Sequence, residues 1–269
     1  MKKILSLIKN KIENAENLYN NSFGKFRNLA AVFSYLASIK NLPSNEQEDM
    51  MPCFQEYIEN VLKGNEAFIN MRYNTTEQPH LKKIFSSDTS ISEKWLHKNP
   101  SVEVKSGFTI QETDNPEDLM LIGTETPSCQ MVTGNPQFNK CLLGYVVNGD
   151  SLAIVIKKNN KIVARSILRL LWDETKQIPV LLQEKHYNNF KNETDLNKSI
   201  DLWAINKAKE MNLSLISKDI IPEKDKTEYE GQVVYLGGKA PFIYFDSQEG
   251  VNPGNERLEF SNCHYLYKN

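Results

Sequence analysis

Residues 141–187 read CLLGYVVNGDSLAIVIKKNNKIVARSILRLLWDETKQIPVLLQEKHY, and this stretch decides the fold. Its apolar segments are short, rich in β-branched residues and separated by polar turns, which is typical of antiparallel strands. Asn148-Gly149 is a tight-turn signal between the first two segments. The stretch therefore predicts an antiparallel meander of three or four strands. We expect these strands at residues 141–147, 152–156, 162–172 and 178–187.

A helix and another strand follow the meander. Asp195 can cap a helix whose apolar residues recur at helical spacing as far as Met211. Asn212 fits the position just after the helix end. Residues 213–216 then form a short apolar strand.

The last part of the chain predicts a hairpin and a closing strand. Gly237-Gly238 separates the apolar runs 233–236 and 242–245, which we expect to pair with each other. Residues 257–267 alternate between apolar and polar and predict one final strand.

From residue 141 to residue 216 the predicted order is strand, strand, long strand, strand, helix, strand. This order resembles the central half of the GNAT acyltransferase fold. The helix at 197–211, with AINKAK at 204–209, is similar to the helix that follows the fourth strand of that family. The resemblance is one of topology, and it implies an acyltransferase-like core within an α+β fold.

The anion-binding motif of that family is absent from the chain. GNAT enzymes hold the pyrophosphate of acyl-coenzyme A with a Gln/Arg-x-x-Gly-x-Gly/Ala turn, whose exposed backbone N–H groups bind the anion. The matching residues 187–194 read YNNFKNET and contain no glycine, and Glu193 and Asp195 would repel a phosphate. We therefore carry over no coenzyme A-binding residue, expect no cofactor and interpret the core as degenerate.

Residues 1–98 read as a helical N-terminal subdomain that packs on an α+β domain at 99–269. Apolar residues at helical spacing predict helices at 4–18, 29–37 and 50–61. The apolar run that starts at Ile4 stops too early for a secretory signal. Lysines in the first helix leave binding to a membrane surface open as an alternative to packing on the rest of the chain.

Composition excludes several classes of protein. The chain has 269 residues, 40% of them hydrophobic, which is enough apolar material for a packed core. Its formal net charge of −2 gives no positive field that would attract nucleic acid or an anionic membrane. No run of about 18 apolar residues predicts a transmembrane segment.

Four cysteines, Cys53, Cys129, Cys141 and Cys263, show no spacing typical of a zinc site, so we expect no metal. A chain of this size does not need disulfides for stability. We expect reduced thiols and a cytoplasmic protein, with secretion by a route that uses no signal peptide as the alternative.

Cys129 is the first candidate functional residue, because it lies in a loop between predicted strands, where nucleophiles commonly occur. A nucleophilic thiolate needs an imidazole or a cation nearby. His186, with Glu184 two residues before it on the same strand face, or His264 could supply the imidazole. The alternative is that Cys129 is a small buried apolar residue.

Arg165 and Arg169 are the second candidate. They lie four residues apart on the long predicted strand and therefore share one face. Two guanidinium groups on a partly buried face need counter-charges. Glu184 on the next strand could provide one, and either another protein group or a small phosphate or carboxylate ligand could provide the other.

Two classes of function remain. The first is a binding or regulatory module with a protein partner; the 27 lysines and 29 asparagines would suit a bacterial effector or accessory protein. The second is a cysteine-dependent hydrolase or acyl transferase that uses Cys129, with Arg165 and Arg169 binding an anionic group. The absence of a compact catalytic motif favours the binding module.

Overall fold

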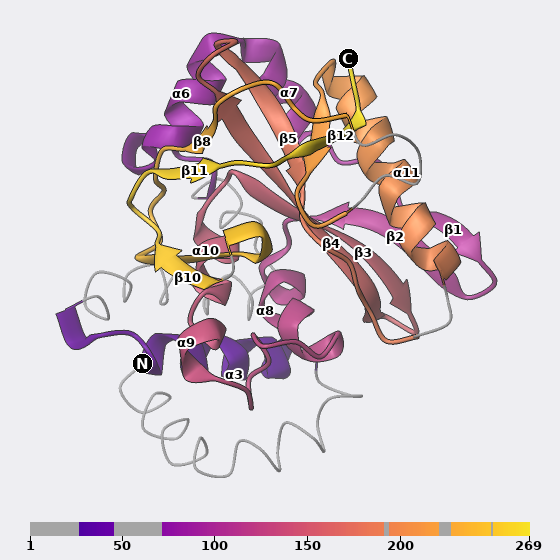
Figure 1. Ribbon diagram of the computed structural model, residues 1–269. Helices are drawn as coiled ribbons and strands as arrows, with labels where there is room; N and C mark the ends of the chain where they lie inside the picture. Colours follow the sequence, from indigo (N-terminus) through magenta and orange to yellow (C-terminus); the bar gives the residue numbers. More distant parts are fainter. Residues whose placement is uncertain (1–26, 46–71, 191–193, 221–226, 249) are drawn as a thin grey trace.

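The structure, a computed structural model, describes residues 27–45, 72–190, 194–220, 227–248 and 250–269. The predicted helices at 4–18 and 50–61, together with Cys53, lie outside the described residues. The described part has the expected α+β class, with helices packed on a large, mostly antiparallel sheet (Figure 1). Among its helices, none is long and apolar enough to cross a membrane.

The sheet runs in the order β1-β2-β3-β4-β5-β7-β12, and each neighbouring pair is antiparallel except β5 and β7. Strands β6 and β8 also pair with β4, β11 pairs with β8, and β9 and β10 form a separate two-stranded sheet. The strands are β1 (Val102–Lys105), β2 (Phe108–Thr113), β3 (Ser151–Lys158), β4 (Lys161–Asp173), β5 (Ile178–Gln183), β6 (Tyr187–Asn188), β7 (Leu215–Ser217), β8 (Val233–Tyr235), β9 (Phe242–Phe245), β10 (Gly250–Pro253), β11 (Leu258–Phe260) and β12 (His264–Tyr267).

Helices cover both faces of this sheet. They are α3 (Arg27–Lys40), α6 (Pro79–Ser87), α7 (Thr89–Leu96), α8 (Pro116–Glu125), α9 (Pro136–Asn139), α10 (Leu142–Val147) and α11 (Thr194–Met211), with 3-10 turns η1 (Thr75–Glu77) and η2 (Asp246–Gln248).

The central ribbon β3-β4-β5 confirms the predicted meander from residue 151 onwards. Asn159 and Asn160 join β3 to β4 with φ angles of 51° and 61°. Two successive positive φ angles are what a two-residue type I′ hairpin turn requires, and asparagine tolerates them. At the next turn, Oδ1 of Asp173 accepts hydrogen bonds from the backbone N–H groups of Thr175 (2.8 Å) and Lys176 (3.0 Å).

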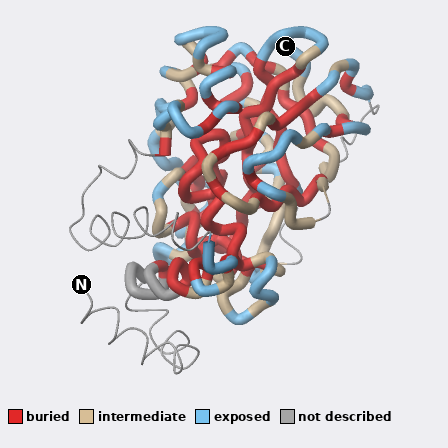
Figure 2. The backbone as a smooth tube through the Cα atoms, turned by 90° about the vertical axis from the view of Figure 1, so that its left-hand side faces the viewer, coloured by how far each residue is buried: buried red, intermediate tan, exposed pale blue. Residues whose placement is uncertain are grey.

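Both faces of this ribbon are buried, because alternate side chains of β3 enter different core clusters. Ala153 and Val155 pack with α3, α8 and α10. Leu152, Ile154 and Ile156 pack with α7 and α11 on the opposite face. Figure 2 accordingly shows a buried backbone through the centre of the molecule. A strand buried on both sides reads as a continuous apolar run rather than an alternating one.

The predicted strand at 141–147 is wrong, because residues 142–147 form α10. The short apolar run at 119–122 also predicts a strand, but these residues lie within α8. Every residue of α10 is buried, and a short, fully buried apolar run fits a helix as well as a strand. A start signal for α8 was present in the sequence: the Asn115 side chain accepts a hydrogen bond from the N–H of Glu117 (2.8 Å). Pro116 occupies the first helical turn, where proline is favoured.

Helix α11 forms the crossover between the parallel strands β5 and β7. It begins at Thr194, one residue before the predicted cap, and Asn212 follows its end with a φ of 59°, as predicted. Leu181 and Leu182 of β5 pair with the first two residues of β7. The predicted order of long strand, strand, helix and strand is therefore present.

A buried lysine attaches α11 to the helices before it. Lys207 Nζ donates hydrogen bonds to the carbonyl oxygens of Lys94 (2.8 Å) and His97 (2.7 Å) at the end of α7. Its charge is balanced by Glu112 of β2, with Nζ 3.2 Å from Oε2. One ammonium group thus joins the crossover helix, a preceding helix and the sheet.

The predicted C-terminal hairpin between 233–236 and 242–245 is wrong. Strand β8 pairs instead with β4 and β11, while β9 pairs with β10. The N–H of Gly238 donates to the carbonyl oxygen of Gly254 and not across a two-residue turn. The expected single strand at 257–267 is divided into β11 and β12, with Asn262 at a φ of 58° between them.

His80 is buried in α6 and links β4 to the residue that follows β8. Its Nε2 lies 2.8 Å from the carbonyl oxygen of Leu170, and the N–H of Leu236 donates to its Nδ1 (3.1 Å). Because Nδ1 accepts, the ring is neutral with its proton on Nε2. Burial lowers the pKa of His80, since the charged imidazolium loses its hydration.

Candidate functional site

A β-bulge in the partner of β4 organises the first candidate site. Gln183 pairs with Leu168, and Tyr187 pairs with Arg165, so residues 184–186 oppose two residues of β4. A bulge of this kind re-aims side chains and ends regular pairing, and bulges are common next to functional sites. Both arginines of β4 lie beside it.

Arg169 is fully buried and bonded on several sides by protein groups. Its Nε donates to Oε1 of Glu184 (2.6 Å), the counter-charge that the sequence predicts, and its Nη2 donates to the carbonyl oxygen of Tyr244 (2.6 Å). Oδ2 of Asp150 lies 3.6 Å from Nη1. The guanidinium also stacks near the Phe245 ring, 4.3 Å from its centroid. Arg169 therefore has internal counter-charges and needs no bound anion.

Arg165 has a different environment on the same face. Its side chain is also buried, and Nε donates to the carbonyl oxygen of Ile122 (2.9 Å) and to Oγ1 of Thr126 (3.0 Å). Nη2 lies 3.3 Å from Oγ of Ser128, and the guanidinium lies over the Tyr187 ring. Across the described residues, no carboxylate forms an ion pair with Arg165. Within these residues, Arg165 is therefore bonded by neutral oxygen atoms, whereas Arg169 is bonded by carboxylates.

Cys129 lies next to this arginine but away from the predicted imidazoles. It is a half-buried free thiol that follows Ser128, and the hydroxyl of Tyr244 faces its sulfur. His186 instead lies 2.7 Å from Oδ1 of Asp201, on α11. Within the described residues, no hydrogen bond joins Cys129 to a histidine.

The remaining two residues of the predicted catalytic set form no hydrogen bond with Cys129 within the described residues. Glu184 accepts from Arg169, and its Oε2 accepts the N–H of Asp246 (3.1 Å). Burial raises the pKa of Glu184, although the Arg169 guanidinium opposes this shift. His264 lies on β12, where its backbone bridges to Glu228. The structure therefore does not bring Cys129, His186, Glu184 and His264 together as a Cys-His-acid constellation.

Asp246 and two tyrosines that the sequence analysis missed, Tyr187 and Tyr244, complete the surroundings of Cys129. The buried Asp246 carboxylate accepts a hydrogen bond from the Tyr187 hydroxyl (2.7 Å) and lies 3.4 Å from Nζ of Lys185. Burial, followed by the charge of Asp246, raises the pKa of both Tyr187 and Tyr244. Both phenols therefore stay protonated at neutral pH and cannot act as bases. The sequence signal that could have indicated Tyr244 is its position two residues before Asp246, at the end of β9.

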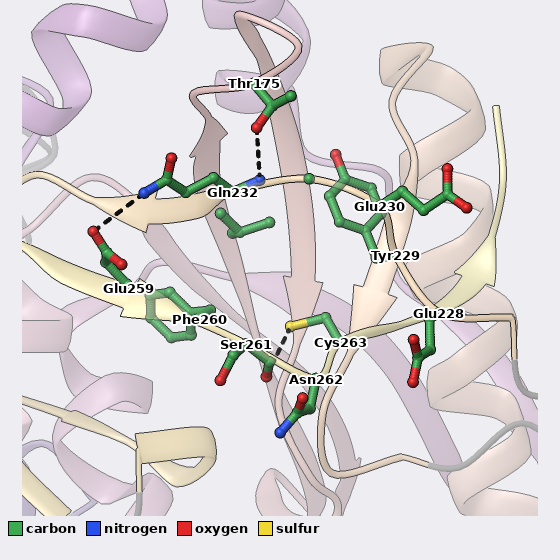
Figure 3. A pocket seen from close by; sticks show the side chains of 12 residues that line it. Thr175, Glu228, Tyr229, Glu230, Gln232, Glu259, Phe260, Ser261, Asn262 and Cys263 are labelled. Atoms are coloured by element: carbon green, nitrogen blue, oxygen red, sulfur yellow. Dashed lines mark hydrogen bonds between the residues drawn. The ribbon is translucent and has the colours of Figure 1, made fainter.

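A second candidate site is an open groove of about 830 Å³ near the C-terminus (Figure 3). We call it the acidic groove, because three of its side chains are carboxylates and none is a cation. Its lining residues are Thr175, Glu228, Tyr229, Glu230, Gly231, Gln232, Val233, Glu259, Phe260, Ser261, Asn262 and Cys263. Apart from a charged loop, no sequence pattern indicates this groove, since its two walls are about thirty residues apart along the chain.

In the part of the chain that the structure describes, no group of three or more His, Cys, Asp or Glu side chains is placed to hold a metal ion. Comparison of the chain with protein-family models, curated proteins and solved structures gives no match.

Proposed function

We propose that this chain is a non-catalytic binding module with a protein partner, built on a degenerate acyltransferase-like core. The observation that carries the proposal is that, within the described residues, no hydrogen bond joins Cys129 to either predicted imidazole, His186 or His264. His186 pairs with Asp201, and Glu184 pairs with Arg169. A general base within hydrogen-bond reach of the nucleophile is the first geometric requirement of thiol catalysis.

The order β3-β4-β5-α11-β7, with its parallel last pair, supports the acyltransferase-like part of the proposal. The first strand on which the resemblance drew is helical, so the likeness covers a shorter stretch than the sequence suggests. The residues that lead into α11 contain no glycine, which argues against a pyrophosphate cradle there. Fold likeness does not establish activity, and we therefore propose that the core has kept the topology without the chemistry.

We also propose a cytoplasmic location, which the free thiols of Cys129, Cys141 and Cys263 support.

One observation favours the alternative, a hydrolase or acyl transferase that uses Cys129. The Arg165 guanidinium is buried without a carboxylate and donates to Ser128, the residue before the cysteine. A cation near a thiol favours the thiolate.

Alkylation of Cys129 by iodoacetamide, followed by mass spectrometry, separates the two functions. For a binding module, we expect the rate to keep rising from about pH 6 to about pH 8. A rate that is already high and constant at about pH 6 would show an activated thiolate and would overturn the proposal. Cys129→Ser serves as the control that assigns the signal, since Cys141 and Cys263 are buried. Calorimetric titration with acetyl-coenzyme A should show no heat of binding.

A further inference from the structure

The acidic groove lies where two antiparallel segments of the chain separate. Val233 pairs with Phe260 at one end of the groove. At the other end, the N–H of Tyr229 donates to the carbonyl oxygen of Cys263 (2.8 Å). Both intervening segments are described, and no backbone hydrogen bond joins them. The opening of about 830 Å³ falls within the range of about 300–1,000 Å³ typical of ligand sites, a size that suits a short peptide segment.

The floor of the acidic groove is apolar and partly aromatic. Tyr229, Val233, Phe260 and Cys263 are all buried and belong to the core cluster that covers β5 and β7. The Tyr229 hydroxyl is held by Oδ2 of Asp173 (2.5 Å), which fixes the ring in place. A rigid apolar floor can accept the methylene stem of a long side chain.

The rim of the acidic groove carries carboxylates that the described residues leave uncompensated. Glu228 and Glu230 are exposed, and neither side chain forms an ion pair or a hydrogen bond within the described part of the chain. Glu259, on the opposite wall, accepts from Arg257 (2.8 Å) and is already balanced. The negative charge available to a ligand therefore lies on the wall formed by Glu228 and Glu230.

Two of the described cations next to the acidic groove, Lys176 and Arg257, do not cancel this charge, because each has an acidic partner of its own. Lys176, which lies over the Tyr229 ring, is 3.8 Å from Oδ2 of Asp173. Arg257 forms a salt bridge with Glu174 as well as with Glu259. Charge complementarity at this site therefore favours a positively charged ligand.

We propose that the acidic groove binds a basic, extended segment of a protein partner. A lysine or arginine side chain lies between Glu228 and Glu230, and its methylene stem covers the apolar floor. This inference rests on the proposed function, because it identifies the chemistry of the partner of a binding module. Acidic partners and nucleic acid are repelled by the same carboxylates.

The test uses the full chain and a fluorescein-labelled heptapeptide in which three arginines alternate with leucines. We expect this peptide to bind at least tenfold more tightly than the same peptide with glutamates in place of the arginines. The double variant Glu228→Gln/Glu230→Gln should weaken binding about fivefold or more, since each exposed ion pair contributes modestly. The arginine peptide should also bind more weakly as salt is raised.

Two further variants separate charge from shape. Glu93→Gln/Glu256→Gln removes the same amount of charge from exposed positions outside the acidic groove and should leave the affinity within about twofold. Ser261→Trp fills the opening without changing the charge and should abolish binding. Circular dichroism and thermal melting confirm that each variant is folded.

Failure of this inference is distinguishable from failure of the proposed function. Equal binding of the two peptides, or an unchanged affinity in Glu228→Gln/Glu230→Gln, overturns the groove proposal alone. A concentration-dependent dimer that Ser261→Trp removes would assign the groove to a second copy of this chain and would also overturn it. An activated Cys129 thiolate overturns the proposed function, whatever the peptides do.

Discussion

Replacing Arg169 by methionine should strongly destabilise the protein, because it leaves a buried carboxylate without its counter-charge. Glu184 is fully buried, and its Oε1 lies 2.6 Å from Nε of Arg169. Asp150, at 3.6 Å from Nη1, loses its partner in the same variant. Methionine preserves much of the side-chain volume, so the change removes charge rather than packing.

The expected loss is about 3–5 kcal/mol, the range for removing one partner of a buried ion pair. The contacts agree with this range, because hydrogen bonds that involve a charged group each contribute about 1.5–3 kcal/mol. Arg169 makes such bonds to Glu184 and to the Tyr244 carbonyl oxygen. A domain is stable by only about 5–15 kcal/mol, so this single substitution removes a large fraction of the total.

Urea denaturation followed by circular dichroism measures the loss as a shift in the transition midpoint. Arg257→Met is the matched control, because its salt bridges to Glu174 and Glu259 are exposed and should contribute about 0–1 kcal/mol. The double variant Arg169→Met/Glu184→Gln should be more stable than the sum of its single variants indicates. A loss below about 1 kcal/mol for Arg169→Met would refute the reasoning.

Three other predictions follow from buried groups. Burial lowers the pKa of His80, so as the pH falls the unfolded chain binds this proton before the folded chain does; the free energy of unfolding, measured in urea, should fall below about pH 6.5 by up to about 1.4 kcal/mol per pH unit, and His80→Gln should reduce this slope. Lys207→Met removes the cation that balances the buried Glu112 and should lower the free energy of unfolding by about 3 kcal/mol or more, as measured by urea denaturation. An unchanged urea midpoint would contradict this prediction. Gly231→Ala places a Cβ in steric conflict with Oδ2 of Asp173 and should lower the melting temperature by several degrees, which a thermal melt equal to wild type would contradict.

Turn residues and apolar patterns in the sequence predicted the central ribbon correctly. They failed where a segment is buried on all sides and its apolar residues therefore show no periodicity. Asn159 and Asn160 carry the turn chemistry of a hairpin in their own sequence, and the strands on either side are long. Residues 142–147 are buried on all sides, so their apolar run has no periodicity that distinguishes a helix from a strand. The C-terminal pairing depended on which distant strand lay beside β8, and that choice is made by tertiary packing.

The candidate site was predictable only where strand register fixed it. Arg169 pairs with Leu182 because β4 and β5 are antiparallel neighbours joined by a turn, and Glu184, two residues after Leu182, lies diagonally across from Arg169 and bonds to it. Cys129 and His186 belong to segments with no such constraint, and the fold directs His186 to α11 instead. The walls of the acidic groove meet through the pairing of β8 with β11, which the sequence did not reveal.

Helix α3 has a consequence for any attempt to trim this protein to its sheet. Ser34 Oγ donates to the carbonyl oxygen of Met120 (2.8 Å), and Ser38 Oγ donates to that of Asn139 (3.1 Å). Tyr35, between them, is wholly buried against α8 and α10. A shortened chain that begins after this helix would expose an apolar surface and would leave two carbonyl groups without their serine donors. We therefore expect it to precipitate rather than fold alone.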